Sequence, residues 1–376
     1  MTRRRVLLGA AFVVTVAAGC LLARPYVRAL SFVVRAADWH GVVRRLADLD
    51  AETVNERELT LSAGDRVLRA RAYEPAGGSR RTALVVPGLQ AGGIDEPRMV
   101  RLSRALAASG VAVVTPEFPD LAAFAITPAL TDTIEAVALD LARTPELAPD
   151  GRVALIGISF GGGPSIVAAG RPALRDRVAW VFVMGGYADL PRVIDHLSRA
   201  GWGTHDYGVA LVLLGVADRL VPPEQVAALS AGVRRFLRAS ALDRVDPAGA
   251  QREFAALREQ ARTLPEPSAT LLALVTARDV TRLGAQLRPH VGGYGQEPAL
   301  SPSRSPTPSA PVFLLHGIDD PIIPSSESEQ LAARLGGHAP VRLLLSGLLT
   351  HADAARAPRP LDVLPLVAFW ADLLSR

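Results

Sequence analysis

A serine placed between two glycines is the residue of this sequence best suited to nucleophilic chemistry. It is Ser159, in the segment Gly-Ile-Ser-Phe-Gly at 157–161. The apolar run 152–156 is typical of a buried strand, and 164–170 is typical of a helix that ends at a glycine. A sharp turn between strand and helix needs small neighbours around the serine, because β-carbons on either side would collide. The pattern predicts a nucleophile at Ser159, and an ordinary structural turn is the alternative.

A carboxylate and a histidine follow this serine in a suggestive order. Asp320 lies in the loop after the apolar run 312–315, and His351 follows the run 341–345 by a few residues. Serine, acid and histidine, each placed after a strand, form the chain order of one known arrangement of the catalytic triad. The sequence therefore predicts that these three side chains meet at one edge of a sheet.

Two other aspartates compete for the role of the acid. Asp319 is the direct neighbour of Asp320, and Asp218 stands in a similar segment, Leu-Gly-Val-Ala-Asp-Arg-Leu-Val-Pro at 214–222. The next histidine after Asp218 is the distant His290, so the interval from Asp320 to His351 is favoured. We expect Asp218 to start or cap a helix instead. His316 is expected to support the turn at 316–324 rather than to act in catalysis.

The elements that must position these residues alternate between strand and helix. Strands are expected at 56–61, 67–73, 83–86, 111–114, 152–156, 179–184, 312–315 and 341–345, and helices at 99–109, 134–142, 164–170 and 361–374. Such alternation predicts a mostly parallel, doubly wound sheet with helices on both faces. The stretch 187–311 leaves this pattern and is mainly helical, which predicts a cap over the carboxyl edge of the sheet. Its end, 289–311, is rich in Gly, Pro and Ser and is predicted to be a flexible linker.

With these motifs in place, the sequence resembles the α/β-hydrolase superfamily over about residues 54–376. The segment Gly-Ile-Asp-Glu-Pro-Arg at 93–98 is similar to a bacterial, esterase-like branch. The resemblance implies that Ser159 is the nucleophile, His351 the general base and Asp320 the residue that orients the imidazole.

The resemblance also implies an oxyanion hole made of backbone N–H groups. One donor should be Phe160, directly after the serine, and the other should come from the glycine-rich loop 87–93. Leu89 is the first choice in that loop and Gln90 the second. Many relatives have His-Gly where this chain has Pro-Gly at 87–88, which leaves the shape of the loop open.

The expected function is hydrolysis of a carboxylic ester through an acyl-enzyme, with no cofactor. A peptide, amide or thioester hydrolase would use the same triad. A non-catalytic protein of this fold that binds a lipid or a partner is the alternative outside enzymes, since one fold hosts many functions.

Composition excludes other classes of function. All 41 basic residues are arginine, and they are dispersed among 37 acidic residues rather than clustered on one stretch, so nucleic-acid binding is not expected. Cys20 is the single cysteine, which excludes a disulfide framework within the chain. The seven histidines form no metal-binding pair, so no metal is expected.

The N-terminus is typical of an export or anchoring segment. Arginines at 3–5 precede an apolar stretch, 6–23, that carries no charge. A retained signal anchor is favoured, with the catalytic domain on the outer side of a bacterial cell membrane. A cleaved signal ending near 17–19, a lipid anchor at Cys20 and a buried helix of the globular domain are alternatives.

Residues 24–50 mix arginines with apolar residues and predict either a helix at the membrane surface or a helical stalk packed on the domain. The predicted segments are an anchor or export signal at 1–23, a stalk or linker at 24–53, the first part of the α/β core at 54–186, the cap with its linker at 187–311, and the second part of the core at 312–376.

Overall fold

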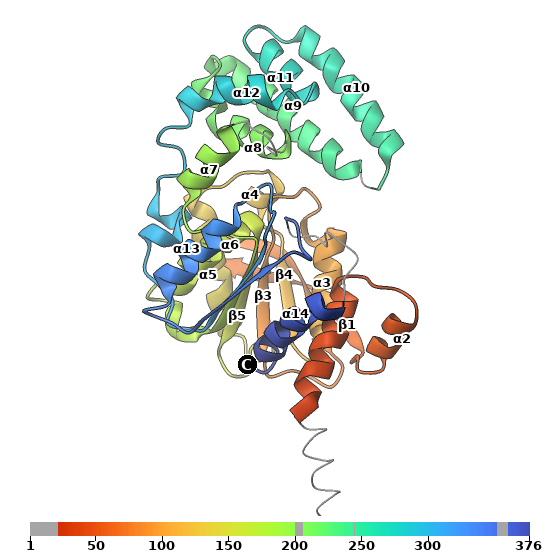
Figure 1. Cartoon of the computed structure of the whole chain (residues 1–376). Coiled ribbons are helices and arrows are strands. Elements are labelled where there is room, and N and C mark those ends of the chain that lie inside the picture. The colour runs from red at the N-terminus through yellow and green to blue at the C-terminus, as the bar shows by residue number, and fades with distance from the viewer. Residues whose placement is uncertain (1–21, 200–205, 244, 352–359) are drawn as a thin grey trace, which may run out of the picture.

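One eight-stranded sheet organises the molecule, in the order β1-β2-β4-β3-β5-β6-β7-β8 (Figure 1). The computed structural model describes residues 22–199, 206–243, 245–351 and 360–376. The strands are β1 Val54–Ala63, β2 Arg66–Pro75, β3 Thr82–Val86, β4 Ala112–Pro116, β5 Val153–Ile158, β6 Val178–Met184, β7 Val312–Gly317 and β8 Val341–Ser346. Strands β1 and β2 are antiparallel to their neighbours, and all other pairs are parallel.

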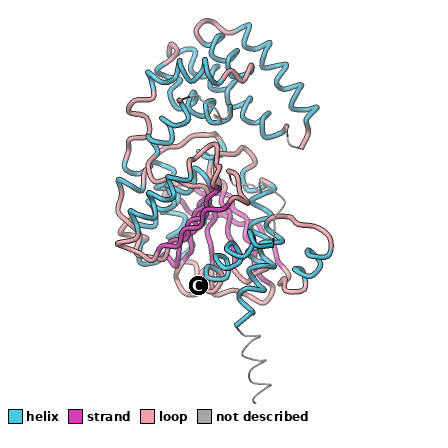
Figure 2. The backbone as a smooth tube through the Cα atoms, viewed as in Figure 1, coloured by secondary structure: helices cyan, strands magenta, loops and turns pink. Residues whose placement is uncertain are grey.

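The central strands are apolar on both faces because helices cover both sides of the sheet (Figure 2). Every residue of β3 and β5 is buried. Along β5, Val153 and Leu155 belong to one core cluster, while Ala154 and Ile156 belong to a second cluster. This alternation follows from the two-residue period of a strand.

Different helices supply the two clusters. Helices α5 and α6 and the later α13 pack in the first cluster, and α3 and α14 pack in the second. Their bounds, with the short α4, are α3 Pro97–Ala107, α4 Pro119–Ala122, α5 Pro128–Ala142, α6 Gly162–Gly170, α13 Ser325–Leu335 and α14 Pro360–Leu373.

In the described part of the chain, six α-helices lie between β6 and β7 and form a layer above the carboxyl edge of the sheet (Figure 1). They are α7 Leu190–Ser198, α8 Asp206–Val216, α9 Pro223–Leu242, α10 Pro247–Thr263, α11 Ser268–Thr276 and α12 Val280–Leu287. Buried rings of Phe236 and Phe254, with centroids 5.7 Å apart, help to join α9 to α10. The predicted fold, a doubly wound sheet with an inserted, mainly helical cap, is confirmed.

A helix at the N-terminal end of the described chain packs on the second cluster. It covers residues 22–36, here called the N-terminal helix. Phe32 is buried, and its ring lies 4.2 Å from the ring of Trp370 in α14. A short helix, α2 Val42–Asp48, follows it. The N-terminal helix is therefore packed on the domain, as one of the two predicted arrangements for this region has it.

The prediction of a flexible linker at 289–311 is wrong. Leu300 is buried in the first core cluster, and the N–H of Ser303 donates to the carbonyl of Ala188 at 2.9 Å. Arg304 Nε donates to Asp189 Oδ2 at 3.0 Å. The segment is rich in Pro and Ser and shows no helical or strand periodicity, but single apolar residues and polar contacts hold it on the core.

The sequence predicts that Asp218 starts or caps a helix: it stands in the first turn of a short helix, but its side chain caps none of the described helices. Asp218 lies exposed in the short 3-10 helix η4 Ala217–Arg219. The next long helix, α9, begins after Pro222 and has no side-chain cap. Proline at the first helical turn starts the helix by its fixed φ, so a capping carboxylate is not needed.

No helix within the described residues is both long and apolar enough to span a bilayer. The anchor predicted at 6–23 lies outside the described residues, except for its last two positions. The anchor therefore stays a prediction, as do the predicted segment boundaries.

Candidate active site

Ser159 occupies a strained turn directly after β5. Its φ is +52°, a left-handed conformation that is uncommon for residues other than glycine. The flanking glycines make this turn possible. A Cβ at Gly157 would lie 2.7 Å from the Cα of Gly162, and one at Gly161 would lie 2.3 Å from the carbonyl oxygen of Pro87. The glycines of the motif are thus required by close backbone contacts on both sides of the serine.

The structure brings Ser159, His351 and Asp320 into one hydrogen-bonded chain. Ser159 Oγ lies 2.6 Å from His351 Nε2, and His351 Nδ1 lies 2.7 Å from Asp320 Oδ2. A carboxylate can only accept, so Nδ1 carries the proton of the neutral imidazole and Nε2 is left to accept from the serine hydroxyl. This tautomer is the one that a general base needs.

Asp320 is held in place by four groups. Its Oδ1 accepts from the N–H groups of Ile322 and Ile323 at 2.8 and 3.0 Å. Its Oδ2 lies 3.3 Å from His316 Nε2, in addition to the contact with His351. Burial by itself raises the pKa of Asp320, but the hydrogen bonds from His316 and His351 outweigh it and bring the pKa well below its usual range. The carboxylate is therefore charged at neutral pH.

The competing aspartates lie elsewhere. Asp319 is exposed to solvent although it neighbours Asp320, because the loop turns it away from the buried side. Asp218 is exposed in the cap, as described above. Of the three aspartates considered from the sequence, Asp320 is the one that contacts His351.

His316 is a residue whose contact with the acid the sequence reasoning missed. It is fully buried at the end of β7. Its Nε2 donates to the carbonyl of Ile323 at 2.9 Å and lies near Asp320, and its Nδ1 lies 2.6 Å from Ser328 Oγ. Since Nε2 must donate, Nδ1 accepts from the serine hydroxyl. The signal in the sequence for this contact is the position of His316, four residues before Asp320 at the carboxyl end of a strand.

The glycine-rich loop after β3 lies against the serine. A Cβ at Gly88 would be 3.0 Å from the Cβ of Ser159. In this loop the N–H of Gln90 donates to the carbonyl of Leu121 at 3.3 Å. That contact favours Leu89 over Gln90 as the backbone donor toward a substrate oxygen. The other predicted donor, Phe160, directly follows the serine in the 3-10 turn η2 Ser159–Gly161.

The cap contacts this loop through a tyrosine. Tyr207, in α8, donates its hydroxyl hydrogen to the carbonyl oxygen of Leu89 at 2.7 Å. The ring of Tyr207 also meets the edge of Phe124, with ring centroids 6.4 Å apart. A second link joins Arg234 Nε of α9 to the carbonyl of Ala123 at 3.0 Å. These contacts place the cap directly over the loop beside Ser159.

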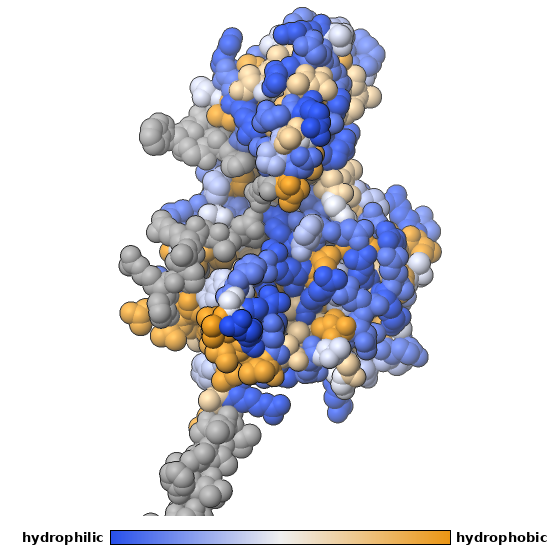
Figure 3. Space-filling model, turned by 90° about the vertical axis from the view of Figure 1, so that its right-hand side faces the viewer, coloured by the Kyte–Doolittle hydropathy of each residue, from blue (hydrophilic) through white to orange (hydrophobic). Residues whose placement is uncertain are grey.

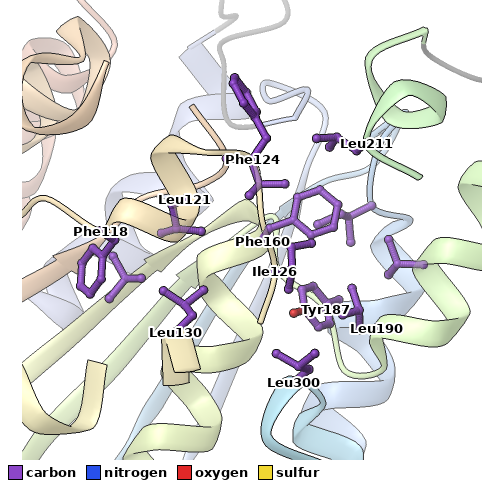
Figure 4. Packing of buried hydrophobic residues seen from close by; sticks show 14 of the residues in the cluster. Phe118, Leu121, Phe124, Ile126, Leu130, Phe160, Tyr187, Leu190, Leu211 and Leu300 are labelled. Carbon is purple, nitrogen blue, oxygen red and sulfur yellow. The ribbon is translucent and has the colours of Figure 1, made fainter. Parts of the chain in front are cut away.

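Apolar side chains from core and cap gather around Phe160 (Figure 4). Ile126, Tyr187 and Leu211 belong to the same buried cluster, and the rings of Phe160 and Tyr187 have centroids 6.0 Å apart. The residue directly after the serine is therefore packed in a buried cluster that joins the core to the cap.

The chain enters the cap through a fixed turn. Gly185 has a φ of +60°, and a Cβ on it would lie 3.4 Å from Asp320 Oδ2. Beyond it, the buried carboxylate of Glu327 accepts from the N–H of Ala188 at 3.0 Å and from Arg192 Nη2 at 3.0 Å. Glu327 thus joins the first turn of the cap to α13.

The described residues hold no group of three or more His, Cys, Asp or Glu side chains arranged to bind a metal ion.

The sequence matches the α/β-hydrolase fold family over residues 84–354. The chain therefore belongs to this family, and the resemblance inferred from the sequence is confirmed. No curated protein matches the sequence at a significant level.

Several solved structures share features of the backbone. A dienelactone hydrolase from Anabaena variabilis is 16% identical, with a TM-score of 0.43, 85% of this chain covered and 96% of that chain. An esterase from Pyrococcus furiosus is 11% identical, with a TM-score of 0.44 and coverages of 86% and 90%. A vibralactone cyclase is 13% identical, with a TM-score of 0.45 and coverages of 92% and 87%.

Proposed function

We propose that the chain is a serine hydrolase that cleaves a carboxylic ester through an acyl-enzyme on Ser159. The observation that carries the proposal is the hydrogen-bonded chain from Ser159 through His351 to Asp320. A serine hydroxyl is a weak nucleophile, and an imidazole within hydrogen-bond reach activates it by taking its proton. The family match supports the same reading.

The first half of the reaction forms the acyl-enzyme. Ser159 Oγ attacks the carbonyl carbon of the ester while its proton passes to His351 Nε2. The N–H groups of Phe160 and Leu89 donate to the oxyanion that develops on the carbonyl oxygen. The C–O bond to the alcohol then breaks, and the leaving oxygen takes the proton from Nε2.

The second half releases the acid. A water molecule attacks the acyl carbon and gives its proton to His351 Nε2. The bond to Ser159 Oγ breaks, and the serine recovers the proton. Throughout, the charged Asp320 stabilises the imidazolium that forms twice in each cycle. No cofactor takes part in these steps.

A fluorophosphonate probe tests the nucleophile. We expect the full chain to be labelled, and we expect Ser159→Ala to abolish labelling while Ser62→Ala, at an exposed serine, leaves it unchanged. A folded wild-type chain that never reacts would favour a non-catalytic binding protein. Labelling that persists in Ser159→Ala would place the nucleophile elsewhere.

A panel of leaving groups tests the substrate class. Matched p-nitrophenyl esters, thioesters and p-nitroanilides of one acyl chain should be compared by kcat/KM. We expect the esters to be cleaved faster than the anilides, because a phenolate leaves more readily than an anilide from the same acyl group. A preference for the anilide or the thioester would assign the site to one of those classes instead.

We also propose that residues 6–23 hold the protein at a bacterial cell membrane, with the hydrolase domain on the outer side. The uncharged apolar stretch after the arginines at 3–5 supports this. Mass spectrometry of the mature protein would show an intact N-terminus. A shortened chain or a lipid on Cys20 would replace the anchor with a cleaved signal or a lipoprotein.

A further inference from the structure

The N-terminal helix and α2 carry an unusual amount of exposed apolar surface. Eight of the thirteen exposed large apolar side chains among the described residues lie on or directly after these two helices. They are exposed to between 44% and 83% and are here called the N-terminal apolar face: Leu22, Tyr26, Val27, Leu30, Val42, Val43, Leu46 and Leu49. Figure 3 shows apolar surface gathered at the lower end of the α/β domain.

Helix α2 exposes its apolar residues, unlike a typical surface helix. An amphipathic helix buries its apolar stripe and exposes its polar residues. In α2, however, Ala47 is the single buried residue, while Val42, Val43 and Leu46 point to solvent. The core of the domain therefore does not explain the apolar residues of this helix.

Buried hydrogen bonds fasten the two helices to each other. Ser31 Oγ donates to the carbonyl of Ala47 at 2.9 Å, and Arg35 Nη1 donates to the same carbonyl at 2.7 Å. Arg35 is buried and also donates to Ser109 Oγ at 3.0 Å. These buried bonds hold α2 beside the N-terminal helix with its apolar residues outward.

The charges on this surface favour an anionic partner. Arg24 and Arg45 are exposed on the two helices, and neither forms an ion pair with the described residues. Arg44 is paired with Asp48 at 3.0 Å. Apolar side chains beside free arginines are the combination by which a helix lies in the headgroup region of a membrane that contains anionic lipid.

The course of the chain favours a membrane as the partner. Leu22, the first described residue, belongs to the face, and residues 6–21 directly before it carry no charged side chain. We propose that the N-terminal apolar face rests on an anionic bilayer surface, as a contact separate from the predicted anchor. The proposal does not depend on the chemistry of Ser159.

This contact would orient the enzyme. The N-terminal helix and the cap lie at opposite ends of the molecule (Figure 1). With the face on the bilayer, the cap and the loop at Leu89 point away from the membrane. The site would then receive substrate from the aqueous side rather than from the lipid layer.

A single fluorescent label tests the contact in the full chain. Leu46→Cys, combined with Cys20→Ser so that one thiol remains, is labelled with an environment-sensitive fluorophore and bound to vesicles of phosphatidylcholine and phosphatidylglycerol. Val245→Cys in the same background is the matched control, because Val245 is 77% exposed and lies between two cap helices. Lipids brominated on their acyl chains serve as the quencher.

We expect the label at position 46 to shift to the blue and to be quenched by brominated lipid, while the label at 245 is unaffected. Equal, unquenched emission at both positions would overturn the proposal. So would a blue-shifted but unquenched label at 46, which would show that a second copy or residues 6–21 cover the face. Carbonate extraction of the unlabelled chain tests the anchor separately. If carbonate removes the chain from the membrane but the label at position 46 is still quenched in the vesicle assay, the anchor is overturned and the surface contact stands. A chain that does not bind the vesicles would overturn both the anchor and the surface contact.

Discussion

Replacing Asp320 by asparagine keeps the shape of the side chain and removes its charge. In the folded protein Oδ1 accepts from the N–H groups of Ile322 and Ile323, while Oδ2 faces His351 Nδ1 at 2.7 Å. The side-chain oxygen of asparagine would still accept the hydrogen bonds from the two backbone N–H groups, so the amide nitrogen would face the imidazole. Because that nitrogen donates, His351 would have to accept at Nδ1 and carry its proton on Nε2.

The altered tautomer would disable the base. His351 Nε2 lies 2.6 Å from Ser159 Oγ and would now donate to the hydroxyl instead of accepting from it. Loss of the correct tautomer in a triad lowers kcat by about 10⁴-fold. At about 1.36 kcal/mol per factor of ten, the barrier rises by about 5.4 kcal/mol. KM should stay unchanged, because the carboxylate is buried behind the imidazole and does not touch the substrate.

Steady-state hydrolysis of a p-nitrophenyl ester by the full chain measures this loss. Asp319→Asn and Asp218→Asn are matched controls at exposed positions, and both should keep the kcat of the wild type. The reasoning is refuted if Asp320→Asn retains more than about a tenth of kcat, a loss below ~1.4 kcal/mol. It is also refuted if either control loses as much activity as Asp320→Asn.

The same carboxylate gives the folded state a pH dependence. Although burial acts to raise the pKa of Asp320, hydrogen bonds from the two histidines and the backbone bring it below the ordinary value of 3.8. The folded protein then binds this proton less readily than the unfolded chain, so the stabilisation is complete above about pH 5 and declines as the pH falls below about 4. In urea unfolding, the excess stability of the wild type over Asp320→Asn should shrink toward pH 3. A constant excess between pH 7 and pH 3 would contradict this.

Two further substitutions test how the oxyanion loop is held. Tyr207→Phe removes the hydroxyl that donates to the carbonyl of Leu89, and should lower kcat more than it raises KM. Tyr294→Phe, in the segment after the last cap helix, should leave kcat unchanged; equal effects would show a general loosening of the structure around the site. Gly161→Ala places a Cβ 2.3 Å from a backbone carbonyl of the loop. It should lower kcat, and it should lower the free energy of unfolding by about 1–3 kcal/mol, as overpacking does. Gly337→Ala, whose Cβ meets nothing within 4 Å, is the control in denaturant unfolding; an equal loss there would contradict the steric argument.

Local patterns were sufficient to predict the sheet and the turn at Ser159. The buried runs before positions 88, 159 and 320 became β3, β5 and β7, because a strand covered on both faces must be apolar throughout. Gly157 is required within the turn itself, because a Cβ there would meet Gly162, whereas Gly161 is required by the carbonyl of Pro87 in the loop after β3. Strand patterns and the turn at Gly157 act over short stretches of chain, so the sequence alone contains them.

Local patterns misled at the segment 289–311. It lacks periodicity, which indicated a flexible linker, but Leu300 is buried and Ser301 Oγ accepts from the N–H of Leu190 at 2.9 Å. A few contacts with residues distant in sequence are enough to hold a Pro-rich segment. They leave no mark on its composition.

By itself, the sequence determined the fold class, the order of serine, acid and histidine, and the turn that carries the serine. Only the tertiary structure decided which neighbours serve these groups: that Asp320 rather than Asp319 faces the imidazole, that His316 also contacts the acid, and that Tyr207 bonds to Leu89 across 118 positions of sequence. The reason is physical. Strand, helix and turn preferences depend on residues close in the chain, whereas the partner of a hydrogen bond depends on how separate elements pack.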